Sequence, residues 1–265
     1  GTVGMGKYYK LTADLDITSY TDWVPIGLRS TYPFRGHFDG NGHTITVKIA
    51  RSDEEYAGLF GYIYGGEICN LSVTGSVRLA TVNKSISICA GGIVACVSRG
   101  TIDSCNFDGK VNLSGANRND YQYAGGIAGY VSSGLGTNST ITNNSAGRND
   151  ASTAVKALFS ISDNPNTYAG GIIGKVRVYN EDSSDGVTIT GNYSRLKTQA
   201  GHTDSLTYGN LDKSYGYIYQ NKILVYDNKE YDPEDYPDPE PTITAPTITT
   251  STLSNATAGQ SYSAT

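Results

Sequence analysis

The sequence YAGGIAGYV, from Tyr123 to Val131, decides the fold because it recurs along the chain. A close copy, YAGGIIGKV, begins at Tyr168, a looser one, CAGGIVACV, at Cys89, and a shortened one, YAGLFGYI, at Tyr56. When the copies are aligned, one column is glycine throughout, at Gly58, Gly92, Gly126 and Gly171. A fixed register, with extra residues confined to polar loops, predicts a stacked repeat architecture.

Each copy is followed by a turn-rich patch and a second apolar stretch. These stretches also align, with their first aliphatic residues at Ile68, Ile102, Ile141 and Ile189. The segments are short, rich in β-branched residues and cut by Gly, Asn, Ser and Asp, which is typical of strands. A repeat of this kind matches one coil of a solenoid whose coils pair edge to edge, about 4.8 Å apart. The pattern predicts an all-β fold, a right-handed parallel β-helix of about five or six coils.

The composition agrees with this fold and narrows the partners. Glycine and tyrosine are abundant, at 32 and 21 residues, and only 17% of the chain is charged. The net charge of −5 provides no basic footprint, which argues against a nucleic-acid partner. No stretch approaches the roughly 18 apolar residues of a membrane span. The sequence opens without methionine, so we expect a mature or cut fragment.

The N-terminal block points to a family. YYKLTADLDITSYTDWVPIG from Tyr8, PFRGHFDGNGHTI from Pro33 and the glycine strings together resemble the GLUG-repeat β-helix proteins of bacterial cell surfaces. The resemblance is strong from Tyr8 to Val176 and fades toward Tyr226. Its most specific positions are Leu11, Asp14, Asp16, Trp23, Pro25, Ile26, Gly27, Phe34, Gly36, Phe38, Asp39, Gly40, Gly42, His43 and Ile45.

This resemblance implies a location and a role. GLUG domains are typical of long secreted proteins, including adhesins and the non-catalytic regions of surface peptidases. It therefore implies an extracellular or bacterial cell-surface location and a part in cell adhesion. One departure from the family pattern is Ala95–Cys96, where Gly-Tyr is usual.

A change in composition near residue 228 predicts the domain organisation. We expect the β-helix domain at residues 1–228 and an acidic, proline-rich linker at 229–241. Residues 242–265 resemble the start of a bacterial immunoglobulin-like domain, too short for a sandwich. An alternative is that this tail adds as a strand to an exposed sheet edge.

The glycine-rich motifs are predicted to be structural. A phosphate-binding loop needs a glycine motif between a strand and a helix, whereas more strand follows each copy here. The turn Asp39, Gly40, Asn41 and Gly42 could be read as a metal loop, but it has too few oxygen ligands for calcium. Asp-Gly and Asn-Gly are typical of tight turns. We therefore predict no cofactor, no metal site and no catalytic residue.

A polysaccharide-cleaving enzyme is the alternative that the fold leaves open. Such enzymes use two or three acids on one groove. The column Cys69, Asp103, Thr142 and Thr190 offers one acid. Asp14 and Asp16 lie in the framework of the family, where turn and backbone contacts explain them.

Tyrosines form the most interesting columns. Tyr56, Tyr123 and Tyr168 precede the glycines, and Tyr62 and Tyr130 form a second column. They either stabilise a ladder of stacked rings or form an exposed platform for sugar rings or a protein. Exposure decides between the two.

Four cysteines, Cys69, Cys89, Cys96 and Cys105, show no CxxC spacing, which argues against zinc. Cys105 aligns with Leu71, so a buried thiol is expected there. Two alternatives remain equal: one disulfide among Cys69, Cys89 and Cys96, or free thiols.

The functional prediction is a non-enzymatic extracellular scaffold or adhesin segment. Its partner would be a protein or carbohydrate on a cell surface, reached through strand faces and the loops at Val131–Thr140 and Tyr179–Gly186. A self-assembling fibre subunit, joined through the tail or the coil ends, is a further alternative.

Overall fold

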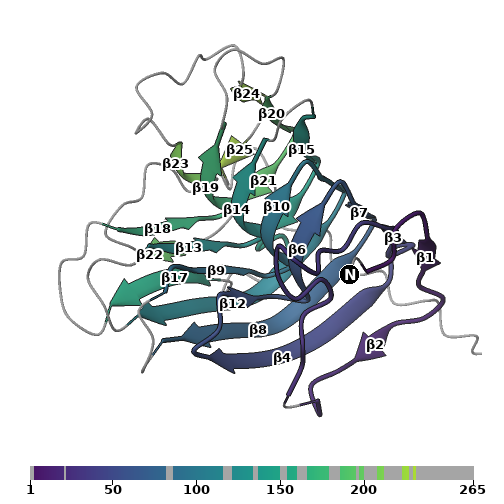
Figure 1. Ribbon diagram of the computed structural model, residues 1–265, viewed down its shortest axis with the longest axis horizontal. Coiled ribbons are helices and arrows are strands. Elements are labelled where there is room, and N and C mark those ends of the chain that lie inside the picture. The colour runs from purple at the N-terminus through teal and green to yellow at the C-terminus, as the bar shows by residue number, and fades with distance from the viewer. Residues whose placement is uncertain are drawn as a thin grey trace, which may run out of the picture. The chain divides into compact units, whose positions relative to one another are not determined.

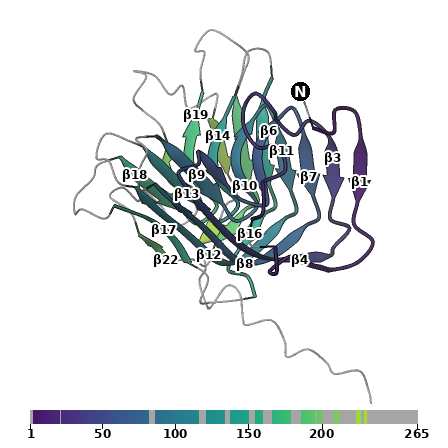
Figure 2. The same cartoon turned by 60° about the horizontal axis from the view of Figure 1, so that its bottom comes forward.

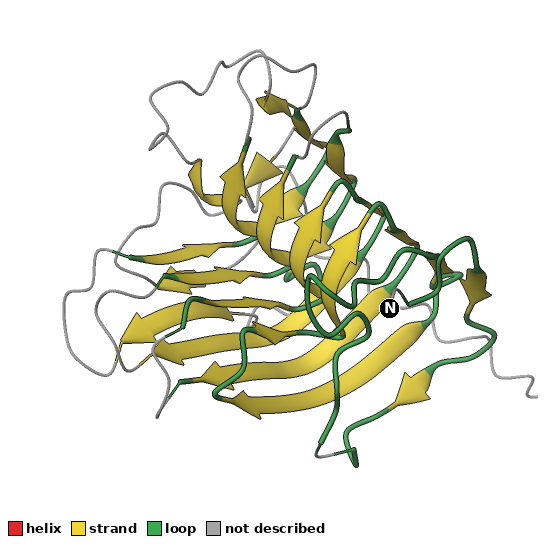
Figure 3. Cartoon of the chain, in the orientation of Figure 1, coloured by secondary structure: helices red, strands yellow, loops and turns green. Residues whose placement is uncertain are grey.

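The computed structural model describes residues 3–20, 22–81, 86–115, 121–133, 137–149, 154–159, 166–178, 186–194, 197–199, 208–211, 223–226 and 229–230. They belong to one compact unit, Gly1–Tyr231. The remaining unit, Asp232–Thr265, lies outside the described residues, and with it most of the predicted linker and the predicted immunoglobulin-like start. The described residues form strands and loops, and none of them belongs to a helix long and apolar enough to cross a membrane (Figure 3).

Four parallel sheets run along the unit (Figure 1). Sheet 1 contains β1 (Tyr8–Lys10), β3 (His37–Asp39), β7 (Glu67–Cys69), β11 (Thr101–Asp103), β15 (Ser139–Thr142), β20 (Val187–Thr190) and β24 (Ile223–Tyr226). Sheet 2 contains β2 (Leu15–Asp16), β4 (Thr44–Ser52), β8 (Ser72–Ala80), β12 (Asn106–Gly115), β16 (Ser145–Ala146), β21 (Tyr193–Ser194) and β25 (Lys229–Glu230), with β17 (Ala154–Phe159) and β22 (Lys197–Gln199) beside them. Sheet 3 contains β5 (Tyr56–Ala57), β9 (Ile88–Gly91), β13 (Gln122–Gly125) and β18 (Thr167–Gly170). Sheet 4 contains β6 (Phe60–Tyr64), β10 (Val94–Ser98), β14 (Ala128–Ser132), β19 (Ile173–Arg177) and β23 (Tyr208–Leu211).

The chain visits the sheets in a fixed order, so each circuit is one coil of a parallel β-helix. Coils 1, 2 and 3 are β3–β6, β7–β10 and β11–β14; coil 4 is β15–β19 and coil 5 is β20–β23. A partial coil with β1 and β2 precedes them, and β24 and β25 follow. Every ladder between these strands is parallel. The predicted all-β parallel β-helix is confirmed, and Figure 2 shows the strands stacked coil upon coil.

The registers agree with the aligned columns. Ile68, Ile102, Ile141 and Ile189 pair in sequence across sheet 1, and all are fully buried. The shortened first string differs at one point. Tyr56 pairs with Cys89, yet Phe60 pairs with Val94, so coil 1 has one residue fewer at the bend between sheets 3 and 4.

Alternation along the strands builds the core. In β8 the side chains of Val73, Val77 and Leu79 point inward and are fully buried, while Arg78 between them is exposed. The same inward positions recur in each coil, and burying these aliphatic side chains stabilises the solenoid. The last described strand, β25, pairs with β21 and ends two residues beyond the boundary at residue 228 predicted from composition.

Candidate functional site

The tyrosines singled out in the sequence lie in two adjacent columns of neighbouring sheets. In sheet 3 the column reads Tyr56, Cys89, Tyr123 and Tyr168 from coil to coil. In sheet 4 it reads Tyr62, Cys96, Tyr130 and Lys175. Each of coils 1 to 4 therefore contributes one residue to each column.

The two columns converge instead of pointing apart. Tyr56 and Tyr62 meet edge to face with ring centroids 5.7 Å apart, and Tyr123 and Tyr130 lie 5.3 Å apart. In Figure 1 the strands of sheet 4 rise steeply from the line of sheet 3. We call this set, Tyr56, Tyr62, Tyr121, Tyr123, Tyr130, Tyr168 and Lys175, the aromatic corner.

Small residues make the convergence possible. A Cβ on Gly129 would lie 2.8 Å from the carbonyl oxygen of Tyr123 and 2.7 Å from that of Ala90. A Cβ on Gly174 would lie 2.6 Å from the carbonyl oxygen of Ala124. These contacts are closer than real Cβ atoms allow, so glycine lets sheet 4 approach the backbone of sheet 3. Gly129 and Gly174 thus bring the two tyrosine-bearing sheets together in coils 3 and 4, whereas coil 2 has Ala95 at this position.

Lys175 joins the rings of coils 3 and 4. Its Nζ lies 4.4 Å from the centroid of Tyr168, 5.3 Å from Tyr123 and 5.4 Å from Tyr121. Its side chain is almost fully buried. Such cation–π contacts strengthen when they are desolvated. The repeat alignment did place Lys175 in the Tyr130 column, but it assigned no role to Lys175 or to Tyr121.

The aromatic corner is neither a flat exposed platform nor a sealed core. Tyr168 is 9% exposed, Tyr121 is 40% exposed, and Tyr62, Tyr123 and Tyr130 are half-buried. Tyr123 also stacks on Tyr168 at 5.6 Å and on Tyr121 at 6.0 Å. Burial raises the pKa of Tyr56 above its ordinary value. The rings therefore stabilise one another and still present part of their surface to solvent.

Coil 2 places two thiols where its neighbours have rings. Cys89 and Cys96 are both buried and free, between the tyrosine layers of coils 1 and 3. Burial raises the pKa of each thiol, and a hydrogen bond with Tyr62 partly offsets this for Cys96. Thiols of raised pKa are poor nucleophiles.

All four cysteines are free, so the structure contains no disulfide among them. Cys105 is buried, as its alignment with Leu71 predicted, and its Sγ lies 3.3 Å from the carbonyl oxygen of Asp103. Cys69 is the one that is partly exposed, in sheet 1.

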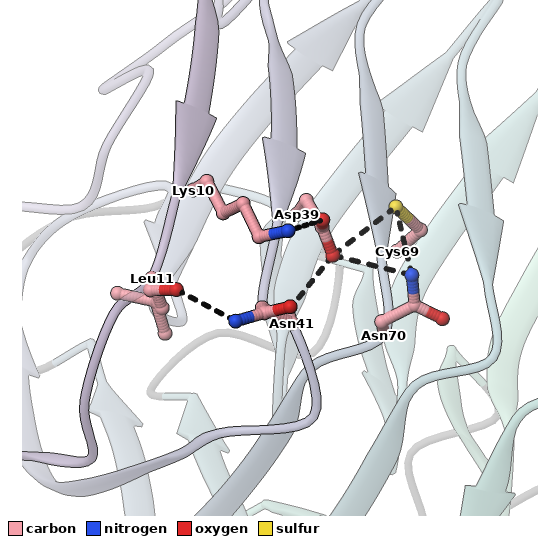
Figure 4. Close-up of polar contacts among 6 residues, drawn as sticks. All are labelled: Lys10, Leu11, Asp39, Asn41, Cys69 and Asn70. Atoms are coloured by element: carbon pink, nitrogen blue, oxygen red, sulfur yellow. Dashed lines mark hydrogen bonds and ion pairs between the residues drawn. The ribbon is translucent and has the colours of Figure 1, made fainter.

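Asp39 closes a turn (Figure 4). Its Oδ1 accepts hydrogen bonds from the Asn41 amide at 2.8 Å and from Asn70 Nδ2 at 3.2 Å. These bonds, with Lys10 Nζ 3.7 Å from Oδ2, lower the pKa of Asp39. Asn41 has φ +52° and Gly42 φ +78°, and a Cβ on Gly40 would lie 2.5 Å from the Asn70 carbonyl oxygen.

The other polar side chains of that turn diverge. Asn41 Nδ2 donates to the carbonyl oxygen of Leu11 at 3.2 Å, and His43 Nδ1 lies 3.1 Å from Asp14 Oδ1. Among the described residues no group of three or more His, Cys, Asp or Glu side chains could hold a metal ion.

The acidic column is longer than predicted. Asp39 pairs with Cys69, which pairs with Asp103, so two acids lie two coils apart where the sequence suggested one. The alignment missed Asp39 because no copy of the glycine string precedes the strand that contains it. Asp103 Oδ1 accepts hydrogen bonds from Thr142 Oγ1 at 2.6 Å and Asn143 Nδ2 at 2.9 Å.

A buried asparagine pair also escaped the sequence reading. Asn144 and Asn192 occupy the corner position that Leu71 and Cys105 hold in earlier coils, and both are 1% exposed. Asn144 Nδ2 donates to the carbonyl oxygen of Ile102, and its Oδ1 accepts from the Cys105 amide. The sequences TITNN and TITGN do align the two asparagines. The column was not recognised because its residue type changes from Leu71 and Cys105 to asparagine.

The geometry defines the class of protein, which is a parallel β-solenoid with an aromatic corner. Comparison with solved structures agrees, since the fold is similar to that of "a putative immunoglobulin A1 protease from Bacteroides ovatus". The TM-score is 0.50 and the identity 22%, over 86% of this chain and 69% of the other. At this identity the likeness concerns the fold alone.

The sequence itself is similar to part of a protein of Evansella cellulosilytica named "Putative Gly-rich membrane protein". The identity is 44% over 80 residues, which are 28% of this chain and 9% of that protein. No model of a known protein family matches the chain. The resemblance to GLUG-repeat proteins stays a prediction.

Proposed function

We propose that this chain is a non-enzymatic scaffold segment of adhesin type, at a bacterial cell surface or outside the cell. Its partner is a carbohydrate or protein on a neighbouring surface. The predicted GLUG and immunoglobulin-like modules would extend and present the solenoid. The Bacteroides ovatus fold and the Evansella membrane protein are compatible with this setting.

The observation that carries the proposal is the aromatic corner. Half-exposed rings of Tyr121, Tyr123 and Tyr130 meet within 6.0 Å and 5.3 Å, on a backbone held rigid by two parallel sheets. Pre-positioned tyrosines offer apolar faces with hydroxyl edges, which suits both sugar rings and protein side chains. Little conformational entropy is lost on binding when the rings already contact one another.

The carboxylates support a non-enzymatic role. A general acid needs a raised pKa, whereas hydrogen bonds from Asn41 and Asn70 lower the pKa of Asp39. The two acids of its column, Asp39 and Asp103, are both engaged by neighbouring turns.

The test is a screen of the chain against glycans and host surface proteins. For any ligand found, Tyr121→Ala and Tyr123→Ala should each raise Kd by roughly three- to tenfold, the value of one aromatic contact. Tyr20→Ala is the matched control, because Tyr20 is exposed on the N-terminal coil. Equal loss in the control would remove the aromatic corner as the site, and cleavage of any polysaccharide in the screen would overturn the non-enzymatic reading.

Self-assembly through a coil end is a second candidate, favoured by the N-terminal coil. Strands β1 and β2 are edges of sheets 1 and 2; Tyr8 and Tyr9 of β1 are 80% and 42% exposed, and Leu15 of β2 is 44% exposed. Exposed apolar edges are ready for pairing with another chain. Light scattering should then show oligomers that grow with concentration and vanish in Tyr8→Lys with Leu15→Lys, while a monomer at all concentrations would dismiss this candidate.

A further inference from the structure

A second cluster, away from the aromatic corner, lies where sheet 4 turns into sheet 1. The guanidinium carbon of Arg35 lies 4.9 Å from the ring centroid of Tyr64, and that of Arg99 lies 4.8 Å from it. We call these three residues the arginine stack. Both distances match the spacing between successive strands of a sheet, about 4.8 Å.

The register explains this match. Arg35 follows Phe34, which pairs with Ile63 next to Tyr64, so Arg35 lies one coil before the tyrosine. Ser98 pairs with Tyr64, and Arg99 follows Ser98, so Arg99 lies one coil after the tyrosine. The tyrosine is therefore held between two guanidinium groups, one from the preceding coil and one from the following coil.

Arg99 adopts an unusual backbone conformation to reach this position. Its φ is +57°, in the left-handed region that residues other than glycine rarely occupy. In the same column Gly65 has φ +68° at the corner of coil 1. The left-handed turn directs the arginine back over the ring of the coil before it.

Within the described part of the chain, neither Arg35 nor Arg99 has an acidic partner. The ion pairs among the described residues join Lys10 to Asp39, His37 to Glu67, His43 to Asp14 and Arg51 to Glu54. Glu67, the acid that follows Tyr64 by three residues, contacts His37 at 2.9 Å. Arg99 Nε is buried without a hydrogen bond among the described residues, and Arg35 and Arg99 are both half-buried.

We propose that the arginine stack binds a linear acidic polysaccharide in which charged sugars alternate with uncharged ones. Stacking on Tyr64 orients each guanidinium, whose free N–H edges match the planar, bidentate geometry of a carboxylate or sulfate. The two cations are separated by two coil spacings, about 9.6 Å. This is comparable to the length of a disaccharide unit in an extended polysaccharide.

The periodicity favours a polysaccharide over an acidic peptide. The cations repeat along the solenoid axis on a rigid ladder, which suits a polymer whose charges recur at one interval. In sheet 4, Tyr64, Ser98, Ser132 and Arg177 occupy one column, so a further arginine lies two coils beyond Ser98 in the same direction. The site is separate from the aromatic corner and does not depend on the function proposed for it.

Binding of the whole chain to immobilised hyaluronate tests the proposal, with chondroitin sulfate, polygalacturonate, poly-glutamate and dextran as comparison probes. Arg35→Gln and Arg99→Gln should each raise the Kd for hyaluronate by about tenfold, the value of one charge-assisted hydrogen bond. Raising the ionic strength from about 0.1 M to about 1 M should abolish binding, because screening shortens the range of the attraction. Chondroitin sulfate should bind too, since its anionic sugars also alternate with others, and dextran should not.

Matched variants separate the geometry from the charge. Arg78→Gln makes the same charge change on the exposed face of sheet 2 and should leave the Kd unchanged. Arg99→Lys keeps the charge and the side-chain stem but loses the planar group, so it should weaken binding like Arg99→Gln. Tyr123→Ala should bind hyaluronate normally, which distinguishes this site from the aromatic corner.

Circular dichroism and thermal melting confirm that each variant is folded. The proposal is overturned if the Arg35 and Arg99 variants bind as the wild type does, or if Arg78→Gln weakens binding equally. Normal binding by Arg99→Lys would overturn the stacked geometry. Tighter binding of poly-glutamate than of hyaluronate would replace the polysaccharide with an acidic protein, and preference for polygalacturonate would overturn the alternating charge.

Discussion

Asn144 Nδ2 donates a hydrogen bond to Asn192 Oδ1 at 3.0 Å, one coil further along the solenoid. Each amide also satisfies main-chain groups of the coil before it, since Asn192 Nδ2 donates to the carbonyl oxygen of Ile141 at 2.8 Å. In coils 3 and 2 the same corner is filled by Cys105 and Leu71. The corner thus changes from apolar filling to a polar ladder along one chain.

Replacing Asn144 should destabilise the fold more than its size suggests. Asn144→Ala leaves the Cys105 amide and the Ile102 carbonyl without their side-chain partner in a buried corner. We expect a loss of about 1–3 kcal/mol in the free energy of unfolding, measured by urea denaturation. Asn112→Ala, on the outer face of sheet 2, should change stability by less than about 0.5 kcal/mol. An equal loss in both variants would contradict a specific role for the ladder.

Gly129 should tolerate no side chain. In Gly129→Ala the new Cβ meets carbonyl oxygens of Ala90 and Tyr123 at 2.7 and 2.8 Å, so sheet 4 must move away from sheet 3. We expect a loss of roughly 1–3 kcal/mol in unfolding free energy and altered near-ultraviolet dichroism, because the Tyr123 and Tyr130 rings separate.

The matched control for this glycine is Gly42→Asn. A Cβ there meets nothing within 4 Å, and asparagine tolerates a φ of +78°. If the control is as unstable as Gly129→Ala, backbone conformation and not close approach of the sheets explains the glycine requirement.

Acid should weaken the N-terminal turns. Hydrogen bonds from the Thr44 amide and His43 lower the pKa of Asp14, and those from Asn41 and Asn70 lower the pKa of Asp39. A carboxylate whose pKa is lower in the folded state stabilises the fold above its unfolded pKa, near 3.8. This contribution is lost as the pH falls through the folded-state value.

Thermal melting from neutral pH to below about pH 3 measures this effect. The melting temperature of the wild type should fall steeply at the acid end, and Asp14→Asn with Asp39→Asn should show a shallower fall. Asp22→Asn is the control, since Asp22 is exposed and makes no hydrogen bond among the described residues. A double variant with the slope of the wild type would refute the assignment.

The four thiols should differ in reactivity. Burial raises the pKa of all four thiols, but Cys69 is partly exposed, whereas Cys89, Cys96 and Cys105 are buried. A thiol-specific chromogenic reagent should therefore label one thiol of the native chain quickly and the other three only after denaturation. Cys69→Ser should abolish the fast phase. Rapid labelling of Cys89 or Cys96 would show that the aromatic corner opens.

The sequence predicted the fold and which residues of successive coils align in columns. The isoleucine column of sheet 1 and the paired tyrosine columns lie in the predicted register because repeat spacing records which residues become neighbours. Spacing does not record angles. The convergence of Tyr123 and Tyr130 depends on the bend between two sheets, and the inward and outward alternation is interrupted at every bend.

The repeat pattern also could not predict contacts between unlike residues of neighbouring coils. The stack of Arg35 on Tyr64 joins an irregular N-terminal segment to coil 1, with no repeat to align. The place of Asp39 in the acidic column could not be predicted either, because no repeat aligns with the segment before it. Lys175 stands where other coils have an aromatic ring or a thiol, and the alignment gave no reason to expect that it contacts three rings.

The bend between sheets 3 and 4 contains one residue fewer in coil 1 than in coil 2, yet the ladders on both sides remain paired. The difference in length is confined to the bend and shifts neither strand. Such a bend would let homologous chains gain or lose residues while each sheet keeps its own chemistry. Surfaces on the two sheets are then free to diverge independently, and the solenoid can change what it recognises without changing how it folds.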